Sequence, residues 1–214
     1  MGTTAGGIYG AFSGKVGPVV GSSWKGKPYI KAAPKKRTKK RGEKEKKNQQ
    51  KFAVVHYWLR PILDFVRVGF QNYSETSTGF NAAKSYAMKH AFEQDKKDNF
   101  VFNPSLMLVS HGDLPNPTEI AFEKTSDNLL HVTWNTERPT GATDYDQVML
   151  LAYDDVNKQA IMKLVGQFRS TGSDTLPLSS NTMKPTEFHL YVAFTAYDRS
   201  RQSNSVYLGK VKLK

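Results

Sequence analysis

The residues best suited to bind a partner are cationic and lie close together near the start of the chain. Eleven of the 21 residues from 31 to 51 are Lys or Arg, opposed only by Glu43 and Glu45. Like charges at this density repel one another. Nucleic acid relieves the repulsion by releasing condensed counterions, so its affinity falls steeply with salt. We expect nucleic acid or another polyanion to contact Lys31, Lys35, Lys36, Arg37, Lys39, Lys40, Arg41, Lys44, Lys46 and Lys47.

The same charges also suit anionic partners that are not nucleic acid. Acidic lipid or an acidic protein surface attracts a basic segment too. The structural alternative is a solvated helix start with a tail that only aids solubility. No aromatic RNA-recognition motif accompanies the segment, so phosphate contacts would carry little sequence specificity. The charge is local, because the net +12 lies entirely in residues 1–51, and bases and acids are equal in number after them.

Aromatic residues alternate with lysines before the basic segment, where Trp24 and Tyr29 lie among Lys25, Lys27 and Lys31. Aromatic rings among cations can stack on nucleic-acid bases. The same rings can form the buried side of a β-hairpin, and this is the interpretation we favour. Trp24 and Tyr29 are therefore candidates for stacking or for assembly.

One stretch has the spacing of a phosphate-binding loop. Gly21 and Gly26 are five residues apart and Lys27 follows, as in a Walker A motif. The next residue, Pro28, supplies neither a hydroxyl for Mg²⁺ nor a backbone N–H for phosphate. The strand-like Tyr29 then stands where a helix would begin. We interpret the stretch as a glycine turn in a hairpin.

The remaining polar residues form no catalytic or metal-binding pattern. The histidines lack the helical spacing of metal ligands, and the chain has no cysteine. Aspartates flank one predicted strand, where Ca²⁺ is conceivable, but ordinary turns explain them better. We expect no enzyme activity, no metal and no cofactor. The residues considered are His56, His90, His111, His131, His189, Asp144, Asp146, Asp154 and Asp155.

The first thirty residues are rich in glycine and in β-forming residues. Eight of the sixteen glycines lie in residues 1–26. The pattern predicts a β-hairpin with strands at Val16–Val20 and Trp24–Lys31. Because a two-stranded ribbon is marginal in water, it needs a surface to pack on, in its own domain or in a neighbouring subunit.

A helical pattern begins at about Gly42 and ends at Gly69 and the polar run after it. Apolar residues three or four apart predict one buried face, and Pro61 predicts a kink because it removes a backbone donor. The face comprises Phe52, Val55, Leu59, Ile62, Val66 and Phe70, widened by Val54, Trp58 and Phe65.

A second helix is predicted from Asn81, as the N-cap, to about Phe92. Its expected buried stripe consists of Ala83, Tyr86, Ala87, His90 and Ala91. Residues 100–110 predict a single strand interrupted at Asn103-Pro104, before a proline-containing linker.

After Pro117 the pattern is all-β. Seven runs of apolar or alternating residues, separated by turn residues, match the number of strands in an immunoglobulin-like sandwich. They lie around Ile120–Phe122, Leu130–Trp134, Val148–Tyr153, Ile161–Val165, Leu176–Leu178, Phe188–Tyr197 and Val206–Leu213.

Two parts of this region carry a resemblance to the fibronectin type III family. Trp134, before a polar loop and an alternating strand, resembles the core tryptophan on the family's second strand. The later stretch that contains Pro185 and Phe188 resembles the family's sixth and seventh strands, which include a proline and an aromatic, although Phe188 lacks the usual tyrosine hydroxyl. The resemblance spans about residues 116–214 and implies a binding or spacing module.

The whole chain also resembles a family of bacterial proteins of unknown function, about 200 residues long and seen mainly in Bacteroidetes. Its specific motifs are Gly-x-Phe-Ser-Gly-Lys-Val-Gly, here Gly10–Gly17, and Trp24-Lys25-Gly26. The resemblance implies no biochemical activity.

Together these features predict an α+β protein with an N-terminal glycine-rich hairpin, two helices and a C-terminal seven-stranded fibronectin III-like sandwich. The expected divisions are a hairpin arm at 1–30, a basic segment at 31–51, a helical region with one strand at 52–114, and the sandwich at 115–214. No stretch is apolar enough to span a membrane and no signal peptide is recognised, so a cytoplasmic protein is the default, with signal-independent export left open.

The expected function is that of a non-catalytic structural protein that binds nucleic acid through its basic arm, without strong sequence specificity. The alternative is a self-assembling structural subunit of a filament, shell or phage-like particle, which implies a homo-oligomer. The glycine-rich β-forming residues of the first thirty positions favour that alternative, because such a segment can add strands to a neighbour.

Overall fold

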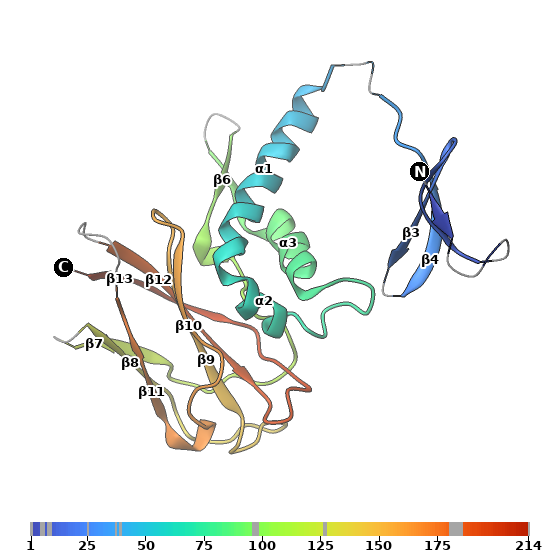
Figure 1. Cartoon of the computed structure of the whole chain (residues 1–214). Coiled ribbons are helices and arrows are strands. Elements are labelled where there is room, and N and C mark those ends of the chain that lie inside the picture. Colours follow the sequence, from blue (N-terminus) through green and yellow to red (C-terminus); the bar gives the residue numbers. More distant parts are fainter. Residues whose placement is uncertain are drawn as a thin grey trace. The chain divides into compact units, whose positions relative to one another are not determined.

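A computed structural model describes residues 2–4, 7, 10–24, 26–36, 38, 40–95, 99–125, 128–179 and 186–213. The chain divides into two compact units, which we name the N-terminal unit, Met1–Gly42, and the C-terminal unit, Glu43–Lys214. The second unit contains both the predicted helices and the predicted sandwich region. Figure 1 shows the elements of both units.

The N-terminal unit is a four-stranded antiparallel sheet in the order β1-β2-β3-β4. Its strands are β1 Thr3–Thr4, β2 Phe12–Val16, β3 Val19–Trp24 and β4 Lys27–Ala32. The predicted strand Val16–Val20 is wrong, because the chain reverses at Gly17-Pro18 between β2 and β3. Gly17 has a φ of 57°, which glycine adopts at little steric cost.

The first predicted helix of the C-terminal unit is confirmed and is interrupted at the predicted proline. The helix α1 spans Glu43–Leu59, a 3₁₀ turn spans Arg60–Ile62, and α2 spans Leu63–Gly69. Pro61 lies in the 3₁₀ turn, as expected of a residue without a backbone donor. The predicted stripe is buried from Val55 to Phe70, whereas Phe52 and Val54 are exposed.

The second of the two predicted helices corresponds to α3, which spans Gly79–His90 and begins earlier than predicted. Asn81 is not the N-cap. Thr78 has extended backbone angles and its hydroxyl accepts a hydrogen bond from the Asn81 backbone N–H, so Thr78 is the cap. On the predicted stripe, Ala83 and Ala87 are buried, while His90 is exposed.

The predicted strand at 100–110 is largely wrong. Strand β6 covers only Phe100–Phe102 and pairs with β5, Phe92–Gln94. The Asn103 side chain then caps a 3₁₀ turn at Pro104–Leu106 by accepting from the Ser105 backbone N–H. Local capping by an Asx side chain competes successfully with strand pairing at this point.

All seven predicted C-terminal runs form strands. They are β7 Ala121–Lys124, β8 Leu129–Thr133, β9 Gln147–Asp154, β10 Gln159–Lys163, β11 Ser173–Pro177, β12 Thr186–Thr195 and β13 Val206–Leu213. They form two antiparallel sheets, in the orders β11-β8-β7 and β10-β9-β12-β13.

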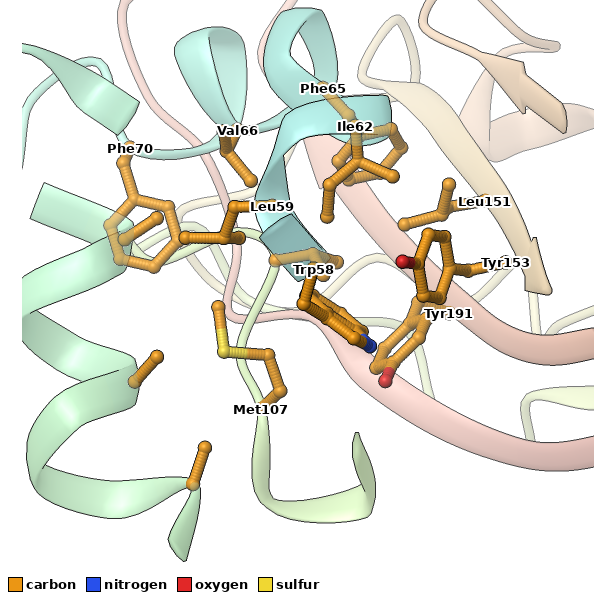
Figure 2. Packing of buried hydrophobic residues seen from close by; sticks show 14 of the residues in the cluster. Trp58, Leu59, Ile62, Phe65, Val66, Phe70, Met107, Leu151, Tyr153 and Tyr191 are labelled. Atoms are coloured by element: carbon orange, nitrogen blue, oxygen red, sulfur yellow. The ribbon is translucent and has the colours of Figure 1, made fainter. Parts of the chain in front are cut away.

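The sheet β10-β9-β12-β13 is covered on both faces, which explains the nearly continuous apolar run of β9. Val148, Leu150 and Ala152 belong to a buried cluster that also contains residues of the three-stranded sheet. Their alternates Met149, Leu151 and Tyr153 belong to a second cluster, built mainly on the helices. Figure 2 shows Tyr153 beside Trp58 in that second cluster, with Leu151 in the same cluster. The helices therefore pack on one face of this sheet and the three-stranded sheet on the other, so that all of them belong to one unit.

Within the described part of the chain, no helix is long and apolar enough to cross a membrane.

Candidate nucleic-acid interface

The strand register of the N-terminal unit separates its side chains into two different faces. Lys15 pairs with Val20, Val20 with Lys31, Ser22 with Tyr29, and Trp24 with Lys27. Paired residues project to the same side of a sheet, and so do residues two apart. One side therefore carries the residues that we name the basic face: Lys15, Trp24, Lys27, Tyr29 and Lys31.

The two aromatic residues of the basic face are open to solvent. Trp24 is 49% exposed and Tyr29 is 43% exposed. The Lys31 ammonium lies 5.9 Å from the centroid of the Tyr29 ring, within cation–π range. Our expectation that these rings form the buried side of a hairpin is therefore wrong, since the rings share their face with three cations.

The opposite side of the sheet is apolar. The residues that alternate with the basic face include Phe12, Val16, Val19, Gly21 and Ile30, which we name the apolar face. A Cβ on Gly21 would lie 2.0 Å from the Phe12 carbonyl oxygen, so the two strands approach closely only with glycine there. Ile30 is 64% exposed.

The stretch with Walker A spacing is a hairpin, as expected. Gly21 lies in β3, and Gly26 lies in the turn before β4 with a φ of 78°. Pro28 is paired with Ser23 inside the sheet. Since this segment continues into a strand and not into a helix, it lacks the helix N-terminus that helps to bind phosphate.

The predicted phosphate-binding residues continue from β4 through the link between the units. Lys35, Lys36 and Lys40 are exposed, and Arg41 is exposed beside them. Arg37 and Lys39 lie outside the described residues. No Asp or Glu occurs anywhere in residues 1–42.

The predicted lysines of α1 do not all lie on one side. Lys44 and Lys47 follow helical spacing with Lys51, and all three line a hollow that extends to Phe100 of β6. The Lys51 ammonium lies 3.2 Å from the Phe100 ring centroid, and burial lowers the pKa of Lys51. Lys46 instead lies within 2.7 Å of Glu43 in an exposed ion pair. Such pairs contribute little, so Lys46 can exchange Glu43 for a stronger anion.

Sequence reasoning missed Lys15, Lys51 and Phe100, and it noted Lys27 near Trp24 and Tyr29 without assigning it to a face. Only the strand register shows which side of the sheet Lys15 and Lys27 occupy. Lys51 belongs to the basic segment and follows Lys44 and Lys47 by helical spacing, a signal that was available in the sequence. Phe100 lies 49 residues further along and gives no local signal of its place beside Lys51.

Four of the five histidines, His56, His90, His111 and His189, lie beside aromatic rings at separate places. The His56 ring lies against Phe52, Tyr57 and Phe80. His189 is buried and its Nδ1 is 2.9 Å from the Tyr207 hydroxyl oxygen. Burial, together with the charge of Lys210, lowers the pKa of His189 and favours the neutral ring.

The four aspartates considered for Ca²⁺ have separate structural roles. Asp146 is buried against Arg169, whose Nε lies 3.1 Å from its carboxylate. Asp154 is buried and accepts hydrogen bonds from the backbone N–H groups of Val156 and Asn157 in a turn. Asp144 and Asp155 form ion pairs with Arg138 and Lys158. Across the described ranges, no three potential metal ligands gather at one place.

A family model matches residues 11–209, which is nearly the whole chain. The chain belongs to the family of unknown function DUF6266. This match confirms the expected full-length resemblance to a family without an assigned activity. The match covers strands β2–β4 and helix α1, so the basic face and the lysines of α1 both lie within the part of this DUF6266 member that matches the family. Among curated proteins, none matches the chain.

Proposed function

We propose that this protein is a non-catalytic structural protein that binds nucleic acid mainly through phosphate contacts, without strong sequence specificity. The observation that carries the proposal is the charge of the N-terminal unit. Its 42 residues contain ten Lys or Arg and no Asp or Glu. Counterion release then favours a polyanionic partner.

The side chains of the basic residues support the proposal because they are accessible. Lys27 and Lys31 are exposed on the basic face, and Lys35, Lys36 and Lys40 are exposed after it. In the C-terminal unit, Lys44 and Lys46 of α1 are exposed as well. A nearby carboxylate, Glu43, forms a solvent-exposed pair with Lys46, which a phosphate can replace at little cost.

The C-terminal unit is expected to act as a spacing or contact module. We propose that the two sheets made of β7–β13 form a fibronectin III-like sandwich. Strands β7, β8 and β11 form one of these sheets, and β9, β10, β12 and β13 form the other. The buried cluster shared by the two sheets, with Trp134 in it, supports this proposal. Modules of this architecture occur in many binding proteins, so the architecture alone assigns no ligand.

A salt series tests the nucleic-acid proposal. Each neutralised phosphate contributes a slope of about −0.7 to −0.9 to the dependence of log affinity on log salt. Changing Lys35, Lys36 and Lys40 together to alanine is therefore expected to reduce the magnitude of this slope by about 2 to 3. The measurement is fluorescence anisotropy with a labelled oligonucleotide over a range of NaCl concentrations.

The matched control removes three exposed lysines of the C-terminal unit, Lys89, Lys158 and Lys212, and so lowers the net charge equally. This variant should keep the slope of the unaltered protein. Equal slopes in the two triple variants would contradict a role for the basic segment. An absence of binding at low salt would remove the proposed function altogether.

The edge of the N-terminal sheet favours a second candidate function, self-assembly. Within the described residues β4 pairs only with β3, and all six residues of β4 are exposed. An open strand edge can accept a strand from another chain. Exposed Ile30 adds an apolar contact for such a neighbour.

We expect assembled species at high protein concentration and fewer of them when Ile30 is changed to lysine. Sedimentation velocity of nuclease-treated protein measures this. The control is Val156→Lys, at an exposed turn residue of the C-terminal unit. A strict monomer at high concentration, or equal effects of the two variants, counts against assembly through β4.

A further inference from the structure

Two neighbouring strands display the aromatic rings of the basic face side by side. Trp24 lies opposite Lys27, and Tyr29 is two residues further along β4. Diagonal neighbours of this kind on one face of an antiparallel pair lie about 7–8 Å apart. The two rings are thus separate contact points with cations on both sides of them.

Exposed rings on a cationic surface gain little from a double helix. The faces of the bases in a duplex are stacked on one another, so a flat protein surface reaches mainly phosphates and sugars. Unpaired bases have free faces, and each base that stacks on an aromatic side chain gains about 1–3 kcal/mol. Half-exposed Trp24 and Tyr29 are therefore of use to a single strand and of little use to a duplex.

Charge decides which occupant suits this face. A second copy of the N-terminal unit would bring ten further cations with no carboxylate to balance them. Charge repulsion disfavours a second copy on the basic face itself, whereas the assembly considered above uses the β4 edge and Ile30 of the apolar face. A polyanion can neutralise the lysines, and a nucleic acid can in addition stack its bases on the two rings.

We infer that the basic face selects single-stranded nucleic acid, with Trp24 and Tyr29 stacking on unpaired bases while Lys15, Lys27 and Lys31 contact the phosphates. This inference rests on the proposed nucleic-acid-binding function and names its substrate class. Since every base has a π-face, the stacking adds strand selectivity without sequence selectivity.

The arrangement of the three tryptophans provides a direct measurement. Trp58 is 1% exposed and Trp134 is 5% exposed, so Trp24 is the accessible indole. Stacking of a base on Trp24 is expected to quench its fluorescence. We would titrate the protein with oligo(dT), with oligo(U), with a blunt DNA duplex of equal length, and with heparin, a polyanion that lacks bases.

Oligo(dT) or oligo(U) is expected to quench the fluorescence and to bind more tightly than the duplex. Trp24→Ala should weaken single-strand binding about 5- to 150-fold, the equivalent of one stacked base, and leave duplex binding nearly unchanged. For this variant, affinity is read from anisotropy of labelled oligonucleotides. Trp24→Phe keeps a stacking ring and should retain most of the affinity. Circular dichroism checks that both variants stay folded.

Other outcomes separate the two levels of the proposal. Equal binding of single strand and duplex, with no effect of Trp24→Ala, would overturn strand selectivity and leave the nucleic-acid function standing. Quenching by heparin as strong as that by oligo(dT) would also overturn base stacking. If no nucleic acid binds at low salt, both proposals fail.

Discussion

Replacement of Asp146 by alanine is expected to lower the free energy of unfolding of the C-terminal unit by about 3–5 kcal/mol, because it leaves a buried guanidinium unpaired. Arg169 and Asp146 are 0% and 1% exposed, and Arg169 Nε lies 3.1 Å from Asp146 Oδ2. Burial lowers the pKa of Arg169, and the charge of Asp146 opposes that effect. Without the carboxylate, the positive charge stays buried with less compensation.

Asp146 also organises the loop before β9. Its carboxylate accepts hydrogen bonds from the Thr143 backbone N–H, at 2.9 Å, and from the Thr143 hydroxyl, at 2.7 Å. Arg169 is held from other sides, since it donates to the Pro115 carbonyl and lies 4.8 Å from the Phe194 ring centroid. Alanine at 146 therefore removes a charge partner and a loop acceptor together.

Urea unfolding followed by tryptophan fluorescence measures this loss. Trp134 is a suitable reporter, because its indole N–H donates to the Arg169 carbonyl at 2.8 Å. Asp144→Ala is the control, since Asp144 is half-exposed and its contact to Arg138 is 3.4 Å long. The control should cost less than about 1 kcal/mol. Equal losses in the two variants would show that the buried pair has no special weight.

The contrast between Asp144 and Asp146 also shows why the sequence predicted these acids incompletely. Both were expected to be solvated loop residues, two positions apart. Asp146 is buried because Arg169, 23 residues later, reaches it across the fold. No local pattern indicates such a pair, so burial of a charged residue could be seen only in the structure.

Elements set by local periodicity were predicted well. The seven C-terminal strands follow alternation of apolar residues or continuous apolar runs, and Pro61 marks the helix interruption at the residue level. Element ends that depend on which side chain caps the backbone were predicted less well. Thr78 replaces Asn81 as the cap of α3, and Asn103 ends β6 through its own side chain.

The candidate site divides in the same way. The lysines after Ala32 were found because a run of charge is visible in the sequence. The basic face was not found, since its composition depends on which residues pair across β2, β3 and β4. An error of one residue in register moves every side chain to the other face. Placing Val16–Val20 in one strand hid the turn at Gly17 and therefore the register.

Trp58 connects the lysine-bearing helix to the rest of the C-terminal unit. Its ring centroid lies 4.7 Å from that of Tyr153 on β9, 5.3 Å from Phe102 on β6 and 6.2 Å from Tyr191 on β12. Figure 2 shows the indole between its own helix and Tyr153 and Tyr191. Trp58 is thus the point at which α1 contacts both the sheet β10-β9-β12-β13 and the strand pair β5-β6 of the C-terminal unit.

We expect Trp58→Ala to lower the free energy of unfolding of the C-terminal unit by about 3–5 kcal/mol, through lost burial and the cavity that remains. The preceding residue gives a matched control, because Tyr57 is 61% exposed on the same helix. Tyr57→Ala should change stability by about 0.5 kcal/mol or less. Urea unfolding followed by far-ultraviolet circular dichroism compares the two, and equal losses would contradict the anchoring role of Trp58.

Loss of the Trp58 side chain should also weaken oligonucleotide binding by the lysines of α1. Lys44, Lys47 and Lys51 are aligned only while the first half of α1 stays helical, and tertiary packing supplies most of that stability. In a temperature range where Trp58→Ala is unfolded and Tyr57→Ala is folded, oligonucleotide affinity should fall in the first variant alone. Binding through the basic face of the N-terminal unit should persist in both, because no described residue of that sheet belongs to the buried cluster that contains Trp58. Complete loss of binding in Trp58→Ala would instead assign the interaction to α1.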